Sequence, residues 1–359
     1  MNIADLPTPA LLLDVSLFER NIQRMATHMA RAGKRLRPHA KAHKCAAIAQ
    51  HQIRAGADGI CVATVSEAEL MVSSGVEDVL LTSPVATSSK CGRMAALADV
   101  ARVSVVVDHP DQVRLYADAA KSRGTRLNVL VDLDVGDHRT GSVPGQPAVD
   151  LAGCIVRETA LTFAGLQAYS VRASHLSAAD GVAEYTAAAL QHAADTRRLL
   201  ERIGMSVPVI TGGSTGTYAF DSQLEQVDEL QPGSYALMDV AYARIGLTEF
   251  DHALTVLATV VSANHRDRVT VDAGFKAFAT DRAFGPDVQG LEGARHQWAG
   301  DEFSFVLLDD SPQRPRLGDR LRFIPPHCDP TVNLYDRMYA CSGDIVVDTW
   351  SIMDRYRAN

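Results

Sequence analysis

The stretch AEYTAAALQHAADTRRLLERIGMSVPVITGGST, residues 183–215, predicts one helix, one short strand and a glycine-rich loop. Its first part is rich in Ala and Leu at helical spacing, and a short apolar run then precedes the glycines. The same alternation recurs along the chain, with strand-like runs at 36–43, 58–65, 78–85, 102–109, 127–136, 163–170, 207–215 and 229–239. About eight strands alternating with helices are typical of a parallel (β/α)8 TIM-like barrel. A doubly wound open sheet is the alternative, because strands are hard to count from a sequence.

The pattern changes near Phe250. From there the chain is β-rich, with turn residues between the apolar runs and little helical spacing. We therefore expect an α/β protein in which residues 18–249 form the barrel and a smaller, mostly antiparallel β domain follows. The early run PALLLDV (9–15) precedes the first helix and is assigned to that second domain. The β domain would then comprise residues 1–17 and 250–359.

Composition narrows the possible function classes. The chain has 359 residues, with 35 Lys plus Arg against 43 Asp plus Glu, and a formal net charge of −8. This balance disfavours nucleic acid or an anionic membrane as the main partner. The start, MNIADLPTPALLLDV, has no basic segment and only a short apolar run, so we expect neither a signal peptide nor a membrane span. The 6 cysteines contain no C-x-x-C pair, which favours free thiols and a cytoplasmic location.

The segment LRPHAKAHKC (36–45) surrounds Lys41 with titratable side chains. If the segment is a strand, His39 and His43 point the same way as Lys41, and Lys44 lies close by. Nearby cations and desolvation lower the pKa of an amine, and a lysine must be neutral to attack a carbonyl. The pattern therefore favours a Schiff-base lysine over the solvated lysine that is the usual alternative.

Two glycine-containing segments follow late strands, TGGSTGT (211–217) and QPGSYALMD (231–239). Glycine lets backbone N–H groups approach an anion, and Ser and Thr hydroxyls add donors. Neither segment has the spacing of a nucleotide-binding P-loop or of a dinucleotide fingerprint. Two such loops after adjacent late strands match the phosphate site of barrel enzymes, so we predict phosphate contacts from Thr215, Gly233 and Ser234. A plain glycine-rich turn is the alternative for each loop alone.

The segment PPHCDPTVN (325–333) supplies a candidate metal site. His327 and Asp329 are two residues apart, so both would project to one side of an extended chain, with Cys328 on the other side. One nitrogen and one oxygen ligand leave coordination positions open for water and substrate, as a catalytic ion requires. A polar loop between prolines is the alternative.

Together these stretches resemble the pyridoxal-phosphate enzymes of the alanine-racemase-like barrel fold, fold type III. Within that fold the chain resembles the branch of D-threonine aldolases, D-3-hydroxyaspartate aldolases and D-serine dehydratases, from its N-terminus to about Asp348. RPHAKAHK (37–44) resembles the branch's cofactor-lysine motif, which implies that Lys41 carries pyridoxal 5'-phosphate. PPHCDPTVNLYD (325–336) resembles its metal motif, which implies that His327 and Asp329 are the metal ligands.

The resemblance implies further site residues. VGDHRTG (135–141) resembles the segment whose arginine, here Arg139, lies beside the cofactor. GLQAYSVRASH (165–175) resembles the segment with a ring-side tyrosine, Tyr169, and an active-site histidine, His175. Tyr242, like the two glycine loops, occupies a position at which the family contacts the phosphate. Core packing for Tyr169 and a hydrogen-bonded position at the barrel rim for His175 are the alternatives.

The metal motif also bears on the reaction. The aldolases of the branch carry His-x-Asp and the D-serine dehydratases His-x-Cys, and Asp329 matches the aldolases. A carboxylate favours Mn²⁺ or Mg²⁺, with Co²⁺ or Zn²⁺ as further candidates. We therefore expect metal-dependent retro-aldol cleavage of a D-3-hydroxy amino acid to glycine and an aldehyde. His175 would be the general base, with His39 or His43 assisting.

Other function classes stay open at this stage. A dehydratase would use the same cofactor but release ammonia and a 2-oxo acid. A racemase would need a second acid or base and no metal, and a non-catalytic cofactor-binding protein would leave the metal motif without a purpose. The sequence does not choose among threonine, phenylserine and 3-hydroxyaspartate. Arg172 is a candidate for pairing with a substrate carboxylate, but the pattern favours a solvent-facing arginine. The resemblance also implies the D configuration and a homodimer.

Overall fold

The computed structural model describes residues 1–353, and these residues form two compact units. The barrel unit comprises residues 25–41 and 48–233. The β unit comprises residues 1–24, 42–47 and 234–353. The chain therefore leaves the barrel unit directly after Lys41, and leaves it again between Gly233 and Ser234.

The barrel unit is built on one parallel sheet. Among residues 1–353 this sheet has 8 strands, in the order β2-β9-β8-β7-β6-β5-β4-β3. The strands are β2 (Arg35–Leu36), β3 (Ile60–Val62), β4 (Asp78–Leu81), β5 (Arg102–Val107), β6 (Leu127–Asp132), β7 (Leu161–Ala168), β8 (Ile210–Gly212) and β9 (Glu229–Leu230). The N–H groups of Asp58 and Cys61 donate to the carbonyls of Leu36 and Pro38 at 2.8 Å, which joins the two ends of the strand order. The sheet closes into a barrel, so the predicted fold class is confirmed.

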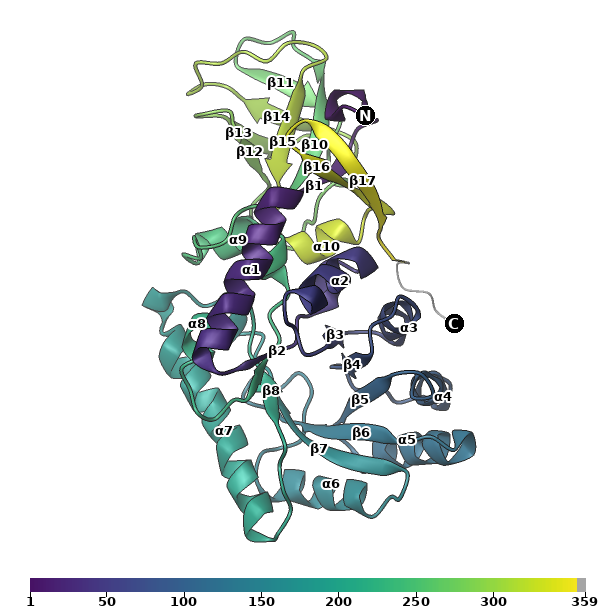
Figure 1. Cartoon of the computed structure of the whole chain (residues 1–359). Coiled ribbons are helices and arrows are strands. Elements are labelled where there is room, and N and C mark those ends of the chain that lie inside the picture. Colours follow the sequence, from purple (N-terminus) through teal and green to yellow (C-terminus); the bar gives the residue numbers. More distant parts are fainter. Residues whose placement is uncertain (354–359) are drawn as a thin grey trace. The chain divides into compact units, whose positions relative to one another are not determined.

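Helices follow most of the barrel strands, and Figure 1 shows α4 to α7 on the outer side of the sheet. Helix α5 illustrates how the sequence sets a helix boundary. It begins at Pro110, because the His109 side chain accepts the N–H of Asp111 at 3.1 Å, and it is followed by Gly124 at φ 76. The helices are α2 (Ala46–Arg54), α3 (Val65–Ser73), α4 (Ser88–Leu97), α5 (Pro110–Arg123), α6 (Gln146–Val156), α7 (Val182–Arg202) and α8 (Tyr218–Asp221).

The barrel interior is filled by side chains. Cys61, Leu80, Val106 and Leu130 come from β3, β4, β5 and β6 and form one buried cluster. Such interior packing leaves catalytic groups to the loops that follow the carboxyl ends of the strands. Those loops carry the predicted residues Arg139 after β6 and Tyr169 after β7.

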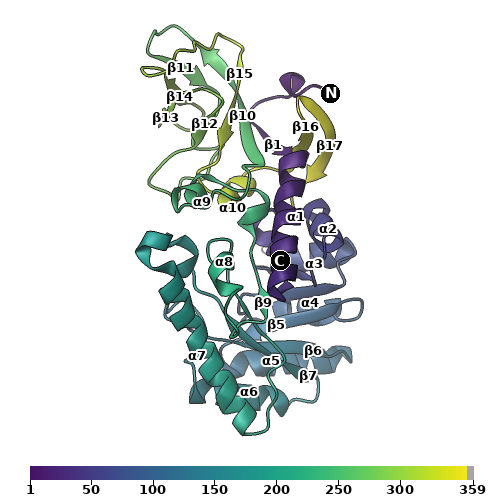
Figure 2. The same ribbon diagram turned by 60° about the vertical axis from the view of Figure 1, so that its left-hand side comes forward.

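The β unit contains a second, mostly antiparallel sheet. Among residues 1–353 it has 9 strands, and its main path runs β13-β14-β11-β10-β1-β16-β17. Strand β1 pairs antiparallel with β10 and parallel with β16, and Figure 2 shows β1 beside β16 and β17. The strands are β1 (Ala10–Asp14), β10 (Leu254–Ser262), β11 (Arg268–Val271), β12 (Asp287–Gln289), β13 (Arg295–Trp298), β14 (Ser304–Leu307), β15 (Arg320–Ile324), β16 (Arg337–Ser342) and β17 (Ile345–Ser351).

The unit boundaries differ from the predicted domain boundaries. Residues 234–249 fall in the β unit although their composition resembles the barrel, and helix α1 (Val15–Ala32) starts in one unit and ends in the other. Helix α9 (Val240–Arg244) shows the reason, because the N–H groups of Val240 and Ala241 donate to the carbonyls of Pro325 and Pro326 at 3.1 and 3.2 Å. These bonds join segments far apart in the chain, which local composition does not reveal. Within residues 1–353, no helix combines the length and apolar character needed to cross a bilayer.

Candidate active site

The predicted site residues fall into two groups. Lys41, Arg139, Tyr169, His175, Thr215 and Gly233 belong to the barrel unit, and Ser234, Tyr242, His327 and Asp329 belong to the β unit.

Lys41 lies in a tight turn rather than on a strand. Strand β2 ends at Leu36, and Ala40–Ala42 form a 3-10 turn. His39 sets the turn, because its Nδ1 accepts the N–H of Lys41 at 3.3 Å. The expectation that His39, Lys41 and His43 share one face of a strand was therefore wrong. Lys41 itself is half-buried, which suits a reactive amine better than full exposure.

His39 is held in place by hydrogen bonds at both of its ring nitrogens. Because Nδ1 accepts a hydrogen bond, the ring proton lies on Nε2, which is 3.0 Å from Thr82 Oγ1. Thr82 Oγ1 donates in turn to the Val62 carbonyl at 3.1 Å. Both ring nitrogens of His39 are therefore engaged within the barrel unit, and its predicted roles beside Lys41 stay predictions.

Arg139 is carried by a loop whose two ends are bonded to each other. Ser142 donates its N–H to the Asp132 carbonyl at 2.8 Å, and Asp134 donates to the Ser142 carbonyl at 3.0 Å. Thr140 Oγ1 adds a bond to the Asp132 carboxylate at 2.9 Å. The loop places the Arg139 guanidinium over the Tyr169 ring, with Cζ 5.2 Å from the ring centroid. The structure thus brings together two residues that the resemblance assigned to the cofactor.

The carboxylate of Asp132 anchors this loop from inside the barrel. Burial raises the pKa of Asp132 to about 6, although hydrogen bonds from Gln167 and Thr140 oppose the shift. Gln167 Nε2 donates to Asp132 at 2.8 Å and to the Thr82 carbonyl at 2.9 Å. A hydrogen-bonded network therefore connects the Arg139 loop to Thr82, the residue that also holds His39.

Tyr169 and His175 lie on one loop after β7. The loop ends in the 3-10 turn Ala173–His175, and both side chains are half-buried. Asp137 organises the loop by accepting the Ser170 hydroxyl at 3.1 Å and the Val171 N–H at 2.5 Å. Arg172 is exposed, and its guanidinium lies over the Tyr185 ring at 5.1 Å. The loop therefore holds Tyr169 and His175 in fixed positions, while Arg172 is engaged at the surface.

The glycine-rich loop after β8 is tightly packed. Gly213 has φ 71, and a Cβ on Gly216 would lie 2.1 Å from the Ser174 carbonyl oxygen, so only glycine fits at 216. Ser214 donates its N–H to Thr217 Oγ1 at 2.9 Å, and Thr217 donates its N–H to the Ser214 carbonyl at 3.3 Å. The N–H of Gly216 has no acceptor among residues 1–353. This free donor fits the predicted binding of an anion such as a phosphate.

The buried carboxylate of Asp221 holds that loop through a hydrogen bond from Thr217. Burial raises the pKa of Asp221 to about 6, against hydrogen bonds from Thr186 and Thr217. Thr186 Oγ1 donates to the carboxylate at 2.6 Å, and Thr217 Oγ1 donates to its other oxygen. Thr217 therefore ties the Ser214 N–H to a buried carboxylate, which keeps that N–H away from any bound anion.

In the β unit, the predicted metal motif is the start of a short helix. Helix α10 (Cys328–Val332) begins directly after His327, so the motif is not extended over its whole length. Cys328 is fully buried, and its Sγ lies 3.3 Å from Asp329 Oδ1. The expectation that Cys328 points away from Asp329 was therefore wrong. Successive side chains alternate between opposite faces in a strand but not in the first turn of a helix, where these two residues lie. Burial raises the pKa of the Cys328 thiol well above its usual range.

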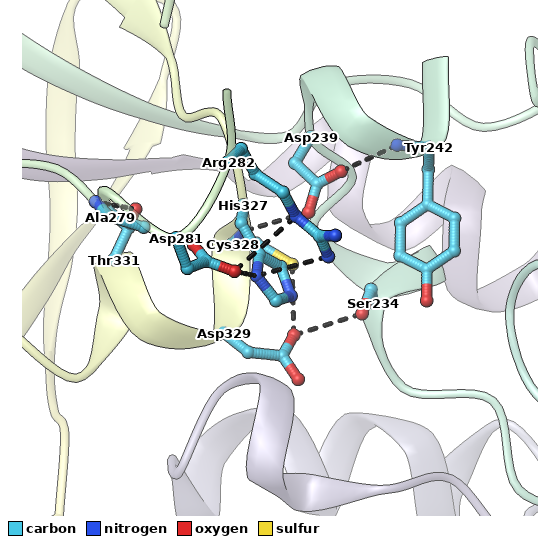
Figure 3. Close-up of polar contacts among 10 residues, drawn as sticks. All are labelled: Ser234, Asp239, Tyr242, Ala279, Asp281, Arg282, His327, Cys328, Asp329 and Thr331. Atoms are coloured by element: carbon cyan, nitrogen blue, oxygen red, sulfur yellow. Dashed lines mark hydrogen bonds and ion pairs between the residues drawn. The ribbon is translucent and has the colours of Figure 1, made fainter. Parts of the chain in front are cut away.

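The motif is connected to the segment of Ser234 and Tyr242 (Figure 3). Ser234 Oγ donates to Asp329 Oδ1 at 3.0 Å. Asp239 accepts the N–H of Tyr242 at 2.9 Å with one oxygen and the N–H of Cys328 at 2.8 Å with the other. One buried carboxylate thus fixes helix α9 and helix α10 together, and burial raises its pKa.

The donor set around His327 fits a labile divalent ion. His327 supplies an imidazole and Asp329 a carboxylate, ligand types that accept Mn²⁺, Mg²⁺ or Zn²⁺. Within residues 1–353, no cluster of three or more His, Cys, Asp or Glu side chains is arranged to hold a metal. Two protein ligands would leave coordination positions of such an ion open for water and substrate.

Sequence reasoning missed several carboxylates that organise these groups. They are Asp132, Asp137, Asp221, Asp239 and Asp281. Asp239 had a local signal, since an Asp directly before the short helical run VAYAR is a typical N-cap. The other four act on partners distant in the chain and have no comparable local signature.

Comparisons with known proteins agree with this architecture. Residues 13–241 match the family described as alanine racemase, N-terminal domain, and residues 253–341 match the putative serine dehydratase domain. A D-threonine aldolase from Arthrobacter sp is 38% identical over 98% of this chain and 94% of its own length. A D-threo-3-hydroxyaspartate dehydratase from Delftia sp. (strain HT23) is 30% identical over 96% of this chain and 97% of its own length. The crystal structure of a D-threonine aldolase from Filomicrobium marinum is 38% identical, with a TM-score of 0.93 and coverage of 97% and 95% of the two chains.

A closed parallel barrel with a lysine after its first strand, followed by an antiparallel β unit, defines the fold type III class of pyridoxal-phosphate enzymes. This assignment places the glycine loops and Lys41 in the part of the chain that matches the alanine racemase domain. The chain belongs to the family that joins this barrel to a serine-dehydratase-like domain, the family of the D-threonine aldolases and the related dehydratases.

Proposed function

We propose that the protein is a pyridoxal-phosphate- and divalent-metal-dependent aldolase that cleaves D-3-hydroxy amino acids to glycine and an aldehyde. The observation that carries the proposal is the carboxylate of Asp329 in the metal motif. Asp329 lies in the short helix α10 and accepts a hydrogen bond from Ser234. A carboxylate at this position matches the aldolases of the family. The 38% identity to a D-threonine aldolase, against 30% to a dehydratase, supports the same choice.

The cofactor-binding residues in this proposal are those predicted from the sequence, with Gly216 added. Lys41 would attach it covalently, and the free N–H of Gly216, together with Thr215, Gly233, Ser234 and Tyr242, would bind its phosphate. Arg139 and Tyr169, already stacked on each other, would lie beside its ring. When bound, pyridoxal phosphate supplies an electron sink for the pair released from the broken Cα–Cβ bond.

The ion would be held by His327 and Asp329, with Mn²⁺ or Mg²⁺ favoured and Co²⁺ or Zn²⁺ possible. A divalent ion at this site would lower the pKa of the substrate's β-hydroxyl and fix the position of that group. His175 would then accept the hydroxyl proton as general base. His39 is not a second base in this proposal, because both of its ring nitrogens already have hydrogen-bond partners.

Product analysis tests the proposal directly. The purified enzyme is incubated with D-threonine and L-threonine, with and without EDTA, and glycine, acetaldehyde, 2-oxobutanoate and ammonia are quantified. We expect glycine and acetaldehyde in equal amounts from D-threonine alone, and no turnover in EDTA. Ammonia with 2-oxobutanoate would establish the dehydratase instead. Conversion of D-threonine to L-allo-threonine, which is inversion at Cα alone, would indicate a racemase. Cofactor absorbance without any turnover would indicate a non-catalytic binding protein.

Three finer points belong to the same proposal. The substrate side chain remains open among threonine, phenylserine and 3-hydroxyaspartate, and relative kcat/KM values on the three would rank them. Arg172 is a weak candidate for binding a substrate carboxylate, because it is exposed and lies over Tyr185. We further propose a homodimer in the cytoplasm, which sedimentation and cell fractionation would test.

A further inference from the structure

Asp281 contacts the proposed metal ligand His327 (Figure 3). Its Oδ2 lies 2.7 Å from His327 Nδ1. A carboxylate oxygen only accepts hydrogen bonds, so the proton of this bond belongs to Nδ1. In a neutral His327 ring with its proton on Nδ1, the lone pair that can bind a metal ion belongs to Nε2. The contact with Asp281 therefore favours the tautomer in which Nε2 is the ligating nitrogen.

The segment that carries Asp281 is fixed to the helix that follows the motif. Ala279 donates its N–H to Thr331 Oγ1 at 3.0 Å, and the Tyr335 hydroxyl donates to the Ala277 carbonyl at 2.9 Å. These two bonds connect the residues just before Asp281 to α10 and the residues after it. The backbone just before Asp281 is thus fixed within the β unit.

Arg282 completes the arrangement by lying beside the same carboxylate. Its Nε is 3.5 Å from Asp281 Oδ2, and its Nη2 is 3.5 Å from His327 Nδ1. Because an arginine N–H only donates, Arg282 and Asp281 require opposite protonation of Nδ1, and the 2.7 Å contact to Asp281 is much shorter than the 3.5 Å contact to Arg282. The shorter contact therefore determines the position of the ring proton. The side chain of His327 is 17% exposed and that of Asp281 is 43% exposed, so the contact lies at the edge of the solvent.

We propose that Asp281 is a positioning residue for the divalent ion: it orients the His327 ring and fixes its proton on Nδ1, so that Nε2 binds the metal. The inference rests on the proposed metal site and adds to it a residue that the His-x-Asp motif does not contain. A partner of this kind on a metal-binding histidine typically changes metal affinity by about 10- to 100-fold when it is removed. Asp281 would not touch the substrate and is not a catalytic residue.

The experiment measures metal binding rather than turnover. The cofactor-loaded protein is stripped with EDTA, desalted and titrated with Mn²⁺, and free Mn²⁺ is followed by electron paramagnetic resonance. We expect Asp281→Ala to raise the Kd for Mn²⁺ by about 10- to 100-fold. Asp281→Asn should have a smaller effect, because an amide oxygen still accepts from Nδ1. Asp344→Asn is the matched control, since it removes a carboxylate of the same unit that pairs with Arg322 at 3.1 Å.

A second readout separates positioning from general damage. Proteins labelled with ¹⁵N-histidine report by NMR which ring nitrogen of His327 carries the proton in the metal-free, cofactor-loaded state, and His327→Ala assigns the signal. We expect the wild-type ring to be protonated on Nδ1 and the Asp281→Ala ring to shift toward the other tautomer. If Asp281→Ala does not fold, Asp281→Leu, which has a similar size and no hydrogen-bond acceptor, provides both measurements.

The outcomes are distinguishable. Weaker Mn²⁺ binding with a shifted tautomer supports the role of Asp281. Mn²⁺ affinity within about twofold of wild type in Asp281→Ala, with His327→Ala unable to bind, overturns this inference and leaves the proposed metal site intact. Unchanged Mn²⁺ binding by His327→Ala overturns both. A tautomer that stays on Nδ1 in Asp281→Ala also rejects the positioning role.

Discussion

Ser234 Oγ donates a hydrogen bond to Asp329 Oδ1 across 3.0 Å, which joins a residue predicted to bind phosphate to a residue predicted to bind metal. A serine hydroxyl has a single proton, so Ser234 cannot donate to Asp329 and to a phosphate through the same proton. Ser234 is also the first residue of the β unit after Gly233. In our proposal, cofactor binding and metal binding therefore compete for one hydrogen-bond donor.

This relationship predicts the behaviour of Ser234→Ala. Loss of a hydrogen bond to a charged carboxylate costs about 1.5 kcal/mol or more, which is roughly a tenfold change in affinity. We expect Ser234→Ala to weaken Mn²⁺ binding by about that factor. Ser177→Ala is the control, because it removes a serine that bonds to Asp180 at 2.5 Å at an exposed site of the barrel unit. Equal Mn²⁺ affinity in wild type and Ser234→Ala would show that the contact is incidental.

Lys41→Ala is expected to abolish covalent attachment of the cofactor. The substitution removes the amine that we assign to the attachment, so the visible absorbance of lysine-bound pyridoxal phosphate and the borohydride-fixed adduct should both disappear. Lys44→Ala is the control and should retain both signals, since Lys44 Nζ donates to Asn333 Oδ1 at 2.8 Å. Mass spectrometry of the reduced peptide provides the measurement. An adduct found on Lys44 in the Lys41→Ala protein would contradict the assignment.

Gly216→Ala tests the phosphate loop. A Cβ at this position would meet the Ser174 carbonyl oxygen at 2.1 Å, so the loop must move and the N–H of Gly216 must move with it. We expect the Kd for pyridoxal phosphate to rise at least about tenfold, equivalent to about 1.4 kcal/mol. Gly92→Ala is the matched control, because a Cβ there meets nothing within 4 Å in helix α4. If both variants bind the cofactor equally, the loop is only a turn.

The fold was predictable because its signals are local. Each barrel strand lies in or beside one of the apolar runs, and the glycine loops follow β8 and β9 as expected. The turn at Lys41 was not predictable from strand periodicity, because the His39 side chain accepts the Lys41 N–H and starts a 3-10 turn. The metal motif was recognised by its residue types, but α10 begins within it, and its partner Asp281 lies 46 positions from His327. Contacts at such separation leave no pattern in one sequence.

Asp221 predicts a specific pH dependence of stability. Burial raises its pKa from an ordinary value of 3.8 to about 6, so the folded state holds this proton more tightly than the unfolded chain does. Its contribution to stability is therefore highest at acidic pH and is lost as the pH rises to about 6. Asparagine does not ionise, so Asp221→Asn should not lose stability in this pH range. The difference in free energy of unfolding, variant minus wild type, should therefore increase by about 2–3 kcal/mol from low to neutral pH. Urea unfolding at several pH values measures the difference, and a difference independent of pH would contradict the raised pKa.

Asp329→Cys is expected to change which metal the enzyme uses. The substitution converts the His-x-Asp motif of the aldolases into the His-x-Cys motif of the related dehydratases. A thiolate is a softer ligand than a carboxylate, so the variant should bind Zn²⁺ in preference to Mn²⁺ or Mg²⁺. The hydrogen bond from Ser234 to the carboxylate would also be lost, which should lower the affinity for a hard ion further.

The measurement is a titration of the EDTA-stripped, cofactor-loaded protein with each ion, followed by product analysis with D-threonine. Asp329→Ala should bind neither ion tightly, whereas Asp329→Asn, which keeps an oxygen ligand, should retain a weakened preference for Mn²⁺ over Zn²⁺. If the cysteine variant prefers Mn²⁺ as strongly as the wild-type protein does, residue 329 does not contribute a metal ligand, and the assignment of the metal site to His327 and Asp329 fails.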